Sequence, residues 1–306
     1  MVDYYSIEMN VAMVADNRGE RATDSTQSLL VTIAILTWNR RAEVERAVRS
    51  ALAQTYQSIE VLVVDSASSD GTADALERQF PIVKVCRLHR NLGCPEGRNI
   101  AFANARGAYI FCLDDDGWLP SDTIEHCVEL FSKDATIGVV TCRILAPGER
   151  PSGTTGQKIV RGFNGGASMV RREVFERAGY YPSDFMRQAE ESDLALRILD
   201  AGFKIVYTDD AVMFHAPSPV NRNIGQFMYY GCRNELFTII RLYPWFLVPF
   251  FIIQKCGSWF VAGARKCHVI PVLRAILSAM MKFPELLSLR KPVRLAAIKQ
   301  SYRLRR

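Results

Sequence analysis

Apolar and polar stretches alternate regularly along the chain from residue 29 onward. Leu29 to Leu36 is a continuous apolar run, which is typical of a strand buried on both faces of a parallel sheet. In the segment that follows, apolar residues from Val44 to Leu52 recur at helical spacing. Two more helices are predicted, one beginning near residue 70 and one over residues 95–105. Further apolar runs predict strands at 59–64, 82–88 and 109–113.

The alternation loosens after residue 113. We expect a helix over 124–131, a strand over 138–142, a surface loop over 147–156 and a strand-like segment that opens at 163–167. A helix over 190–200, closed by Gly202, precedes two short strands at 204–207 and 211–214. The pattern predicts an α/β domain over residues 28–220, with a mostly parallel sheet flanked by helices. Residues 1–27 are polar and are interpreted as a loose N-terminal extension.

Composition narrows the class of protein. The 306 residues are 49% hydrophobic and 23% charged, which excludes a disordered chain and a disulfide scaffold. None of the eight cysteines forms a C-x-x-C pair, which excludes a zinc ribbon. Cys112 and Cys127 lie in apolar surroundings and are predicted to be buried thiols, as in a reducing compartment. No secretory signal is expected at the N-terminus.

Charge separates the chain into two parts. The net charge is +6, but residues 1–220 carry −7 and residues 221–306 carry +13. Such an asymmetry predicts different partners for the two parts.

The basic part, residues 221–306, reads as an amphipathic helical extension. Its apolar run over 242–253 contains Pro244 and Pro249, is interrupted over 254–258, and falls short of the 18 apolar residues expected for a spanning helix. Aromatic residues beside Arg and Lys suit the surface of an anionic membrane, and Val272, Ile276, Ala279 and Met280 would share one helical face. Packing of the segment on the α/β domain and spanning of the membrane remain alternatives. Nucleic acid is disfavoured as a partner, because no recognised module accompanies the charge.

Polar residues follow several of the predicted strands. Asn39, Asp65, Asn91 and Asp114 each fall just after a predicted strand. Ligands of open α/β sheets bind at the carboxyl ends of the strands, so these four residues predict a site at that edge. Taken singly, each could instead be a turn residue or a helix cap.

Two acidic groups are candidates for chemistry. Asp114, Asp115 and Asp116 follow a strand, and residues 114 and 116 of an extended segment project to the same side, so they could share Mg²⁺ or Mn²⁺. The alternative is a solvated acidic turn. Glu190 and Glu191 open a helix, where they could cap it or supply a general base. His215 follows a strand and could be a metal ligand or a structural hydrogen-bonding residue.

These segments, taken in order, resemble glycosyltransferase family 2 with the GT-A fold. The resemblance covers roughly residues 29–220. It rests on the turn Thr37–Arg40, VVDSASSDGT (Val63–Thr72), NLGCPEGRN (Asn91–Asn99), FCLDDD with Leu119-Pro120, FNGGAS (Phe163–Ser168), EESDLALR (Glu190–Arg197) and His215. Where the family more often has Glu-Asp, this chain has Glu190-Glu191, and Ser66-Ala67 also departs from the common pattern.

The resemblance implies a role for each candidate residue. It places Glu191 as the general base and implies a metal site of Asp114, Asp116 and His215. Donor contacts would come from Thr37, Asn39, Asp65, Asp70, Arg98, Asn99 and Asp115. The sugar or acceptor pocket would contain Asn164, Gly165, Gly166 and Glu190.

The activity that the resemblance implies is an inverting, Mg²⁺- or Mn²⁺-dependent transfer of a sugar. The donor would be a nucleotide-diphosphate sugar and the acceptor a saccharide or lipid-linked hydroxyl, in cell-surface polysaccharide or glycolipid synthesis. The protein would be cytoplasmic and peripheral on the inner face of the cell membrane. Two alternatives stay open: a polyprenyl-phosphate sugar transferase and an inactive nucleotide-sugar-binding scaffold.

Overall fold

A nine-stranded sheet forms the centre of the protein. The computed structural model describes residues 29–150, 156–217 and 223–304, so the predicted extension 1–27 and part of the predicted loop 147–156 lie outside the described residues. The strands are ordered β3 (Lys84–Arg87), β2 (Ile59–Asp65), β1 (Val31–Thr37), β4 (Tyr109–Asp114), β8 (Ala167–Arg171), β6 (Ile137–Leu145), β9 (Lys204–His215) and β5 (Gly117–Trp118), with β7 (Lys158–Ile159) paired to β9.

The predicted α/β class is confirmed by the strand directions. The neighbours β3, β2, β1 and β4 run parallel, as do β6 and β9, whereas β8 is antiparallel to both of its neighbours. The two short strands expected at 204–207 and 211–214 are one strand, β9, whose register against β6 shifts between Cys142 and Arg143. The irregularity interrupts the apolar pattern without ending the strand.

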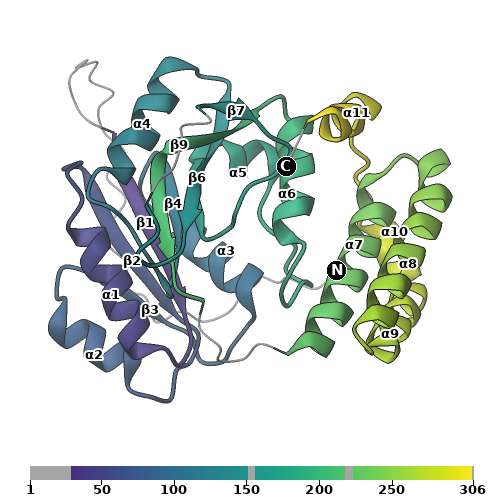
Figure 1. Ribbon diagram of the computed structural model, residues 1–306, viewed down its shortest axis with the longest axis horizontal. Helices are drawn as coiled ribbons and strands as arrows, with labels where there is room; N and C mark the ends of the chain where they lie inside the picture. Colours follow the sequence, from purple (N-terminus) through teal and green to yellow (C-terminus); the bar gives the residue numbers. More distant parts are fainter. Residues whose placement is uncertain (1–28, 151–155, 218–222, 305–306) are drawn as a thin grey trace.

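Helices cover both faces of the sheet (Figure 1). Successive side chains of a strand point to opposite faces, so Ile33 and Ile35 of β1 enter one apolar cluster and Ala34 enters the other. The first cluster includes α1 (Arg41–Leu52), α2 (Thr72–Gln79) and α4 (Thr123–Lys133); the second includes α3 (Cys94–Asn104), α5 (Arg172–Ala178) and α6 (Glu190–Asp200). Cys112 and Cys127 are buried, as predicted.

A layer of helices follows β9 and packs beside α6 (Figure 1). It comprises α7 (Ile224–Leu242), a 3-10 turn (Trp245–Leu247), α8 (Val248–Arg265), α9 (Val269–Met281), α10 (Phe283–Ser288) and α11 (Leu295–Arg303). Leu196 and Leu199 of α6 pack against Ile298 of α11, and Phe185 joins the cluster formed by α7 and α9. The basic segment is therefore joined to the sheet domain by apolar contacts.

The structure corrects two details of this segment. Trp245–Arg265 is continuous helix. Pro249 does not interrupt it, because it lies in the first turn of α8, where the backbone N–H that proline lacks would have no partner within the helix. These 21 residues are long and apolar enough to cross a membrane by length and composition, and only 17% of the most apolar window is buried. On α9, Val272 and Ala279 are buried whereas Met280 is 68% exposed, so the residues predicted to share one helical face differ in exposure; Met280 lies one position beyond the buried face.

Part of the basic charge of the C-terminal segment is paired with acidic residues of the protein itself. Arg241 pairs with Asp184 at 3.0 Å, Arg294 with Asp200 at 3.0 Å, and Lys255 with Glu235 at 2.8 Å. Two of these pairs join the helical layer to the sheet domain. The +13 surplus is thus divided between internal ion pairs and the exposed surface.

Packing of α3 against the sheet should depend on Phe102. This side chain is 1% exposed and stacks on Phe175 with ring centroids 4.5 Å apart. We expect Phe102→Ala to lower the free energy of unfolding by about 3–5 kcal/mol, since it removes buried surface and leaves a cavity. Phe102→Leu, which refills most of the space, should cost clearly less in the same urea titration. Equal losses for both variants would contradict this account of the packing.

Candidate active site

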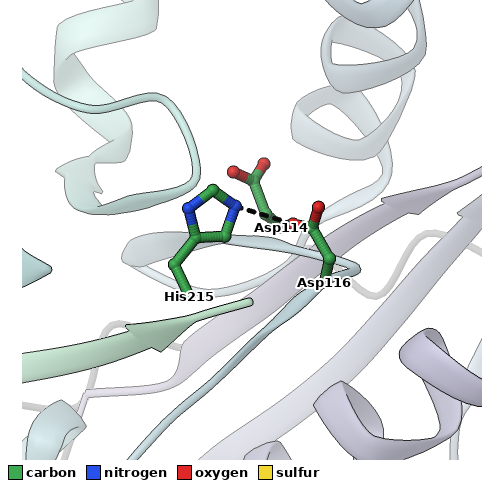
Figure 2. A group of neighbouring side chains, drawn as sticks. All are labelled: Asp114, Asp116 and His215. Carbon is green, nitrogen blue, oxygen red and sulfur yellow. Dashed lines mark hydrogen bonds and ion pairs between the residues drawn. The ribbon is translucent and has the colours of Figure 1, made fainter. Parts of the chain in front are cut away.

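The sheet brings two acidic residues and a histidine together. Asp114 ends β4, and β5 then pairs antiparallel with β9 so that Gly117 lies opposite His215. This pairing places Asp116 beside His215, with 2.9 Å between Oδ1 and Nε2 (Figure 2). One ligand atom from each of Asp114, Asp116 and His215 lies within 4.8 Å of the others. Two residues about 100 positions from the third thus meet through strand pairing.

This trio fits a divalent cation. Carboxylate oxygens are the ligands that Mg²⁺ and Mn²⁺ prefer, and a neutral imidazole nitrogen can join them. Asp116 is only 4% exposed, which is not what a solvated acidic turn would show, while the Asp114 side chain is 35% exposed and reachable from solvent. We therefore keep the trio as the predicted metal site.

Asp115, between the two, faces the protein interior. Its carboxylate accepts a hydrogen bond from Thr37 Oγ1 at 3.0 Å and from Arg40 Nη1 at 2.8 Å. Burial raises the pKa of Asp115 to about 6, although Arg40 favours its charged form. Both Thr37 and Asp115 therefore have their polar groups engaged with protein, which is not the direct donor contact expected of them.

Arg40 is a site residue that the sequence reasoning missed. Besides Asp115 it contacts Asp116, with Nη1 and Oδ2 3.3 Å apart. Its position in the polar turn directly after β1, on the same sheet edge as the acidic cluster, was the available signal. One guanidinium thus compensates part of the charge of two neighbouring carboxylates.

Arg98 connects the predicted metal site to the predicted base. From α3, its Nη2 donates to Asp114 Oδ1 at 2.6 Å, and its Nη1 lies 3.8 Å from Glu191 Oε1. Nη1 is buried and makes no hydrogen bond within the described residues. A buried donor without a partner is costly, so this atom is available for a ligand oxygen.

Gly165 and Gly166 allow this arrangement. A Cβ at Gly165 would lie 2.1 Å from Arg98 Nη1 and 2.3 Å from Glu191 Oε1. At Gly166 it would lie 2.0 Å from Asp114 Cγ. The glycines are needed for close approach to these three side chains, a reason that the sequence did not reveal.

The two glutamates that open α6 have perturbed acidities. Burial raises the pKa of Glu191, while Arg98 and a backbone hydrogen bond from Gly165 act in the opposite direction. Burial and then the charge of Glu191 raise the pKa of Glu190. A carboxyl group with a raised pKa is a better proton acceptor, as general-base catalysis requires.

On the nucleotide side, Asp65 is placed to accept a ligand hydrogen bond. It ends β2 and is 3% exposed, and Ser68 N–H donates to its Oδ2 at 3.1 Å. Its Oδ1 is buried with no hydrogen-bond partner among the residues that the structure describes. This orphaned oxygen is consistent with the predicted contact to a nucleobase.

Three other residues that were predicted to contact the sugar donor form hydrogen bonds with backbone groups instead. Asn39 joins the loops after β1 and β2, accepting from Ser69 N–H at 2.7 Å. Asp70 accepts from Thr72 N–H at 3.1 Å at the start of α2. Asn99 exchanges two hydrogen bonds with the backbone of Tyr181, at 2.9 and 3.0 Å. Asp70 and Asn99 thus bond backbone groups in this structure, and their contacts to the sugar donor stay predictions. Asn164 is exposed, and its backbone N–H bonds Thr141.

The amino-acid sequence is similar to those of known glycosyltransferases. The family model for glycosyl transferase family 2 matches residues 32–188. An uncharacterized glycosyltransferase of Haemophilus influenzae is 25% identical over 184 residues, which cover 56% of this chain and 62% of that protein. The chondroitin synthase of Pasteurella multocida is 33% identical over 140 residues, or 44% of this chain and 14% of that protein. The chain thus spans less than two thirds of the length of these relatives.

Solved structures share the fold. The mannosyltransferase PcManGT from Pyrobaculum calidifontis, in complex with GDP-Man and Mn²⁺, has a TM-score of 0.57 at 22% identity, with 92% of this chain and 85% of that chain covered. GalNAc-T7 with UDP, GalNAc and Mn²⁺ has a TM-score of 0.62 at 17% identity, covering 72% and 49%. With a family match over just over half of its residues, and with the sheet edge described above, the chain belongs to glycosyl transferase family 2.

Proposed function

We propose that the protein transfers a sugar, with inversion, from a nucleotide-diphosphate donor to a hydroxyl of a saccharide or lipid-linked acceptor, and that the reaction depends on Mg²⁺ or Mn²⁺. The observation that carries this proposal is the position of Arg98, in contact with Asp114 of the cation-binding trio and beside Glu191. Relatives named for the synthesis of chondroitin, teichuronic acid and succinoglycan support a saccharide acceptor in polysaccharide synthesis.

Each side chain has a distinct task in this reaction. Asp114, Asp116 and His215 would hold the cation, which supplies Lewis-acid stabilisation of the departing diphosphate. Nη1 of Arg98, which has no hydrogen-bond partner among the described residues, would donate to an oxygen of the sugar donor, and Oδ1 of Asp65 would accept from the nucleobase. Glu191 would take the proton of the acceptor hydroxyl as that oxygen attacks the anomeric carbon opposite the diphosphate.

We also infer attachment of the C-terminal helices to an anionic membrane surface. Phe246, Phe250 and Ile253 of the 3-10 turn and α8 recur at helical spacing and are 70%, 63% and 74% exposed. Ile270, Leu273 and Leu277 make a similar exposed stripe on α9, and two exposed basic residues, Arg265 at the end of α8 and Lys266 directly after it, lie near the start of α9 in the sequence. Aromatic and aliphatic stripes next to basic residues suit the interface of an anionic bilayer. Attachment at this face would place the protein at the inner, cytoplasmic side of the membrane.

Removal of one carboxylate of the trio tests the metal site. We expect Asp116→Asn to lower Mn²⁺-dependent nucleotide release from the donor by about 100-fold or more, because a charged ligand is lost. Isothermal titration of Mn²⁺ with the nucleotide should show weakened binding. Asp122→Asn is the matched control, since it alters an exposed aspartate that also lies near a histidine, His126, at 3.4 Å. Equal binding and turnover in both variants would remove the trio from the proposed site.

The role of Glu191 predicts a particular pH dependence. Its raised pKa means that the carboxyl takes up a proton at a higher pH than an ordinary glutamate, so kcat should fall as pH decreases through a value above the usual carboxyl range. Glu191→Gln should lower kcat by about 100-fold or more and abolish this acidic limb. Unchanged turnover in Glu191→Gln would instead favour the polyprenyl-phosphate sugar transferase, whose phosphate acceptor needs less base catalysis.

Membrane attachment can be measured by flotation with vesicles. The double variant Phe250→Asp, Ile253→Asp should lose binding to phosphatidylglycerol vesicles, since two charges replace exposed apolar side chains. Wild-type binding should weaken with added salt and with neutral phosphatidylcholine. Ile82→Asp is the control, because Ile82 is 81% exposed but lies in the sheet domain. Binding of the double variant at the level of the control would exclude this face as the membrane contact.

A further inference from the structure

The segment directly before the predicted base has an unfavourable backbone conformation. Gln188 and Ala189 both have positive φ angles, of 69° and 66°, and neither is glycine. A left-handed conformation is unfavourable for a residue with a Cβ, and two in succession need compensating contacts. Glu190 and Glu191 follow this turn directly. The contacts that stabilise the turn therefore also determine the positions of the two carboxyl groups.

Asn234 of α7 provides this contact. Its side chain is completely buried, and its Nδ2 donates to the backbone oxygens of Arg187 and Gln188, both at 2.8 Å. Its Oδ1 accepts from Arg233 Nε at 2.9 Å. Two carbonyl acceptors on one side and a guanidinium donor on the other fix the orientation of the amide.

Neighbouring contacts hold the same segment from both sides. Residues 234, 238 and 241 lie on one face of α7, where Thr238 bonds Asp193 at 3.0 Å and Arg241 bonds Asp184 at 3.0 Å. From the other direction, Cys94 N–H at the start of α3 donates to Met186 O at 3.0 Å. The segment 184–193 is therefore clamped between α7 and the helix that carries Arg98.

We propose that Asn234 is a positioning residue: by holding the left-handed turn at 187–189, it fixes the Glu191 carboxylate beside Arg98 and Gly165. The proposal rests on the proposed function for the assignment of Glu191 as base. The helical layer then has a second role besides the proposed membrane attachment. Its helix α7, which lies outside the residues 32–188 matched by the family model, positions the proposed base. Misplacement of a reacting group by about 1 Å can cost on the order of 100-fold in rate, so a distant contact of this kind can matter.

The test compares Asn234→Asp with Val272→Ala. Aspartate keeps the shape and the acceptor for Arg233 but loses both N–H donors and turns an oxygen toward two carbonyls. Val272 is fully buried on α9, in the apolar cluster that also contains Phe185, so its truncation loosens the helical layer but keeps both hydrogen bonds from Asn234 to the turn. Amide hydrogen exchange of residues 186–192 is measured first, because it needs no donor or acceptor. Donor KM and kcat follow as functions of pH.

We expect exchange in this segment to be at least tenfold faster in Asn234→Asp than in Val272→Ala. We further expect kcat to fall about tenfold or more with donor KM within about twofold of wild type, together with a displaced acidic limb. Equal exchange in the two variants would overturn the positioning role, as would an Asn234→Asp variant with the wild-type kcat and pH profile. A wild-type protein that releases no nucleotide from any donor would contradict the proposed function alone, since the exchange comparison still decides the role of Asn234.

Discussion

Mutual repulsion of carboxylates at one edge of the sheet is the constraint on which the site depends. Asp114 ends β4 and Asp115 and Asp116 follow it, while Glu191 of α6 lies beside Arg98, which contacts Asp114. Arg40 and Arg98 compensate part of this charge, each contacting one or two of the aspartates. The remaining negative charge would attract the divalent cation that we propose, and the buried Nη1 of Arg98, which has no hydrogen-bond partner among the described residues, would donate to the sugar donor.

The surrounding fold serves this arrangement. The parallel strands β1, β2 and β4 end at the same edge, and the short antiparallel strand β5 turns the chain back so that Asp116 meets His215. Gly165 and Gly166 allow their loop to approach the side chains of Arg98, Glu191 and Asp114 closely. On the far side of α6, α7 holds the turn that leads to Glu191. The site is thus assembled from the sheet, from α3 and α6, which carry Arg98 and Glu191, and from the glycine loop, with α7 holding the turn before α6.

Local sequence patterns predicted the parts of the fold that depend on local forces. Apolar runs and helical spacing identified β1, β2, β4 and α1, because burial of these segments follows from their own residues. The pattern was wrong where distant contacts decide: β9 is one strand because β6 pairs with it on both sides of the register shift. The helix α8 continues past Lys255, whose charge pairs with Glu235 of α7. Pro249 reads as an interruption in the sequence but lies where a helix begins.

The same distinction applies to the site. Asp114, Asp116 and His215 could be predicted because their types and positions after strands restrict their chemistry, and the structure brings them together. Asp70 and Asn99 belong to the same motifs, yet their side chains bond backbone, which no spacing reveals. Arg40 and Asn234 act through partners about 75 and 47 residues away in sequence, so only the folded chain identifies them. The most direct measurement of the central claim is nucleotide release from a panel of nucleotide-diphosphate sugars, with Mn²⁺ and with the metal chelated. The account predicts release from at least one donor that is lost on chelation; release that is indifferent to chelation, or none from any donor, would contradict it.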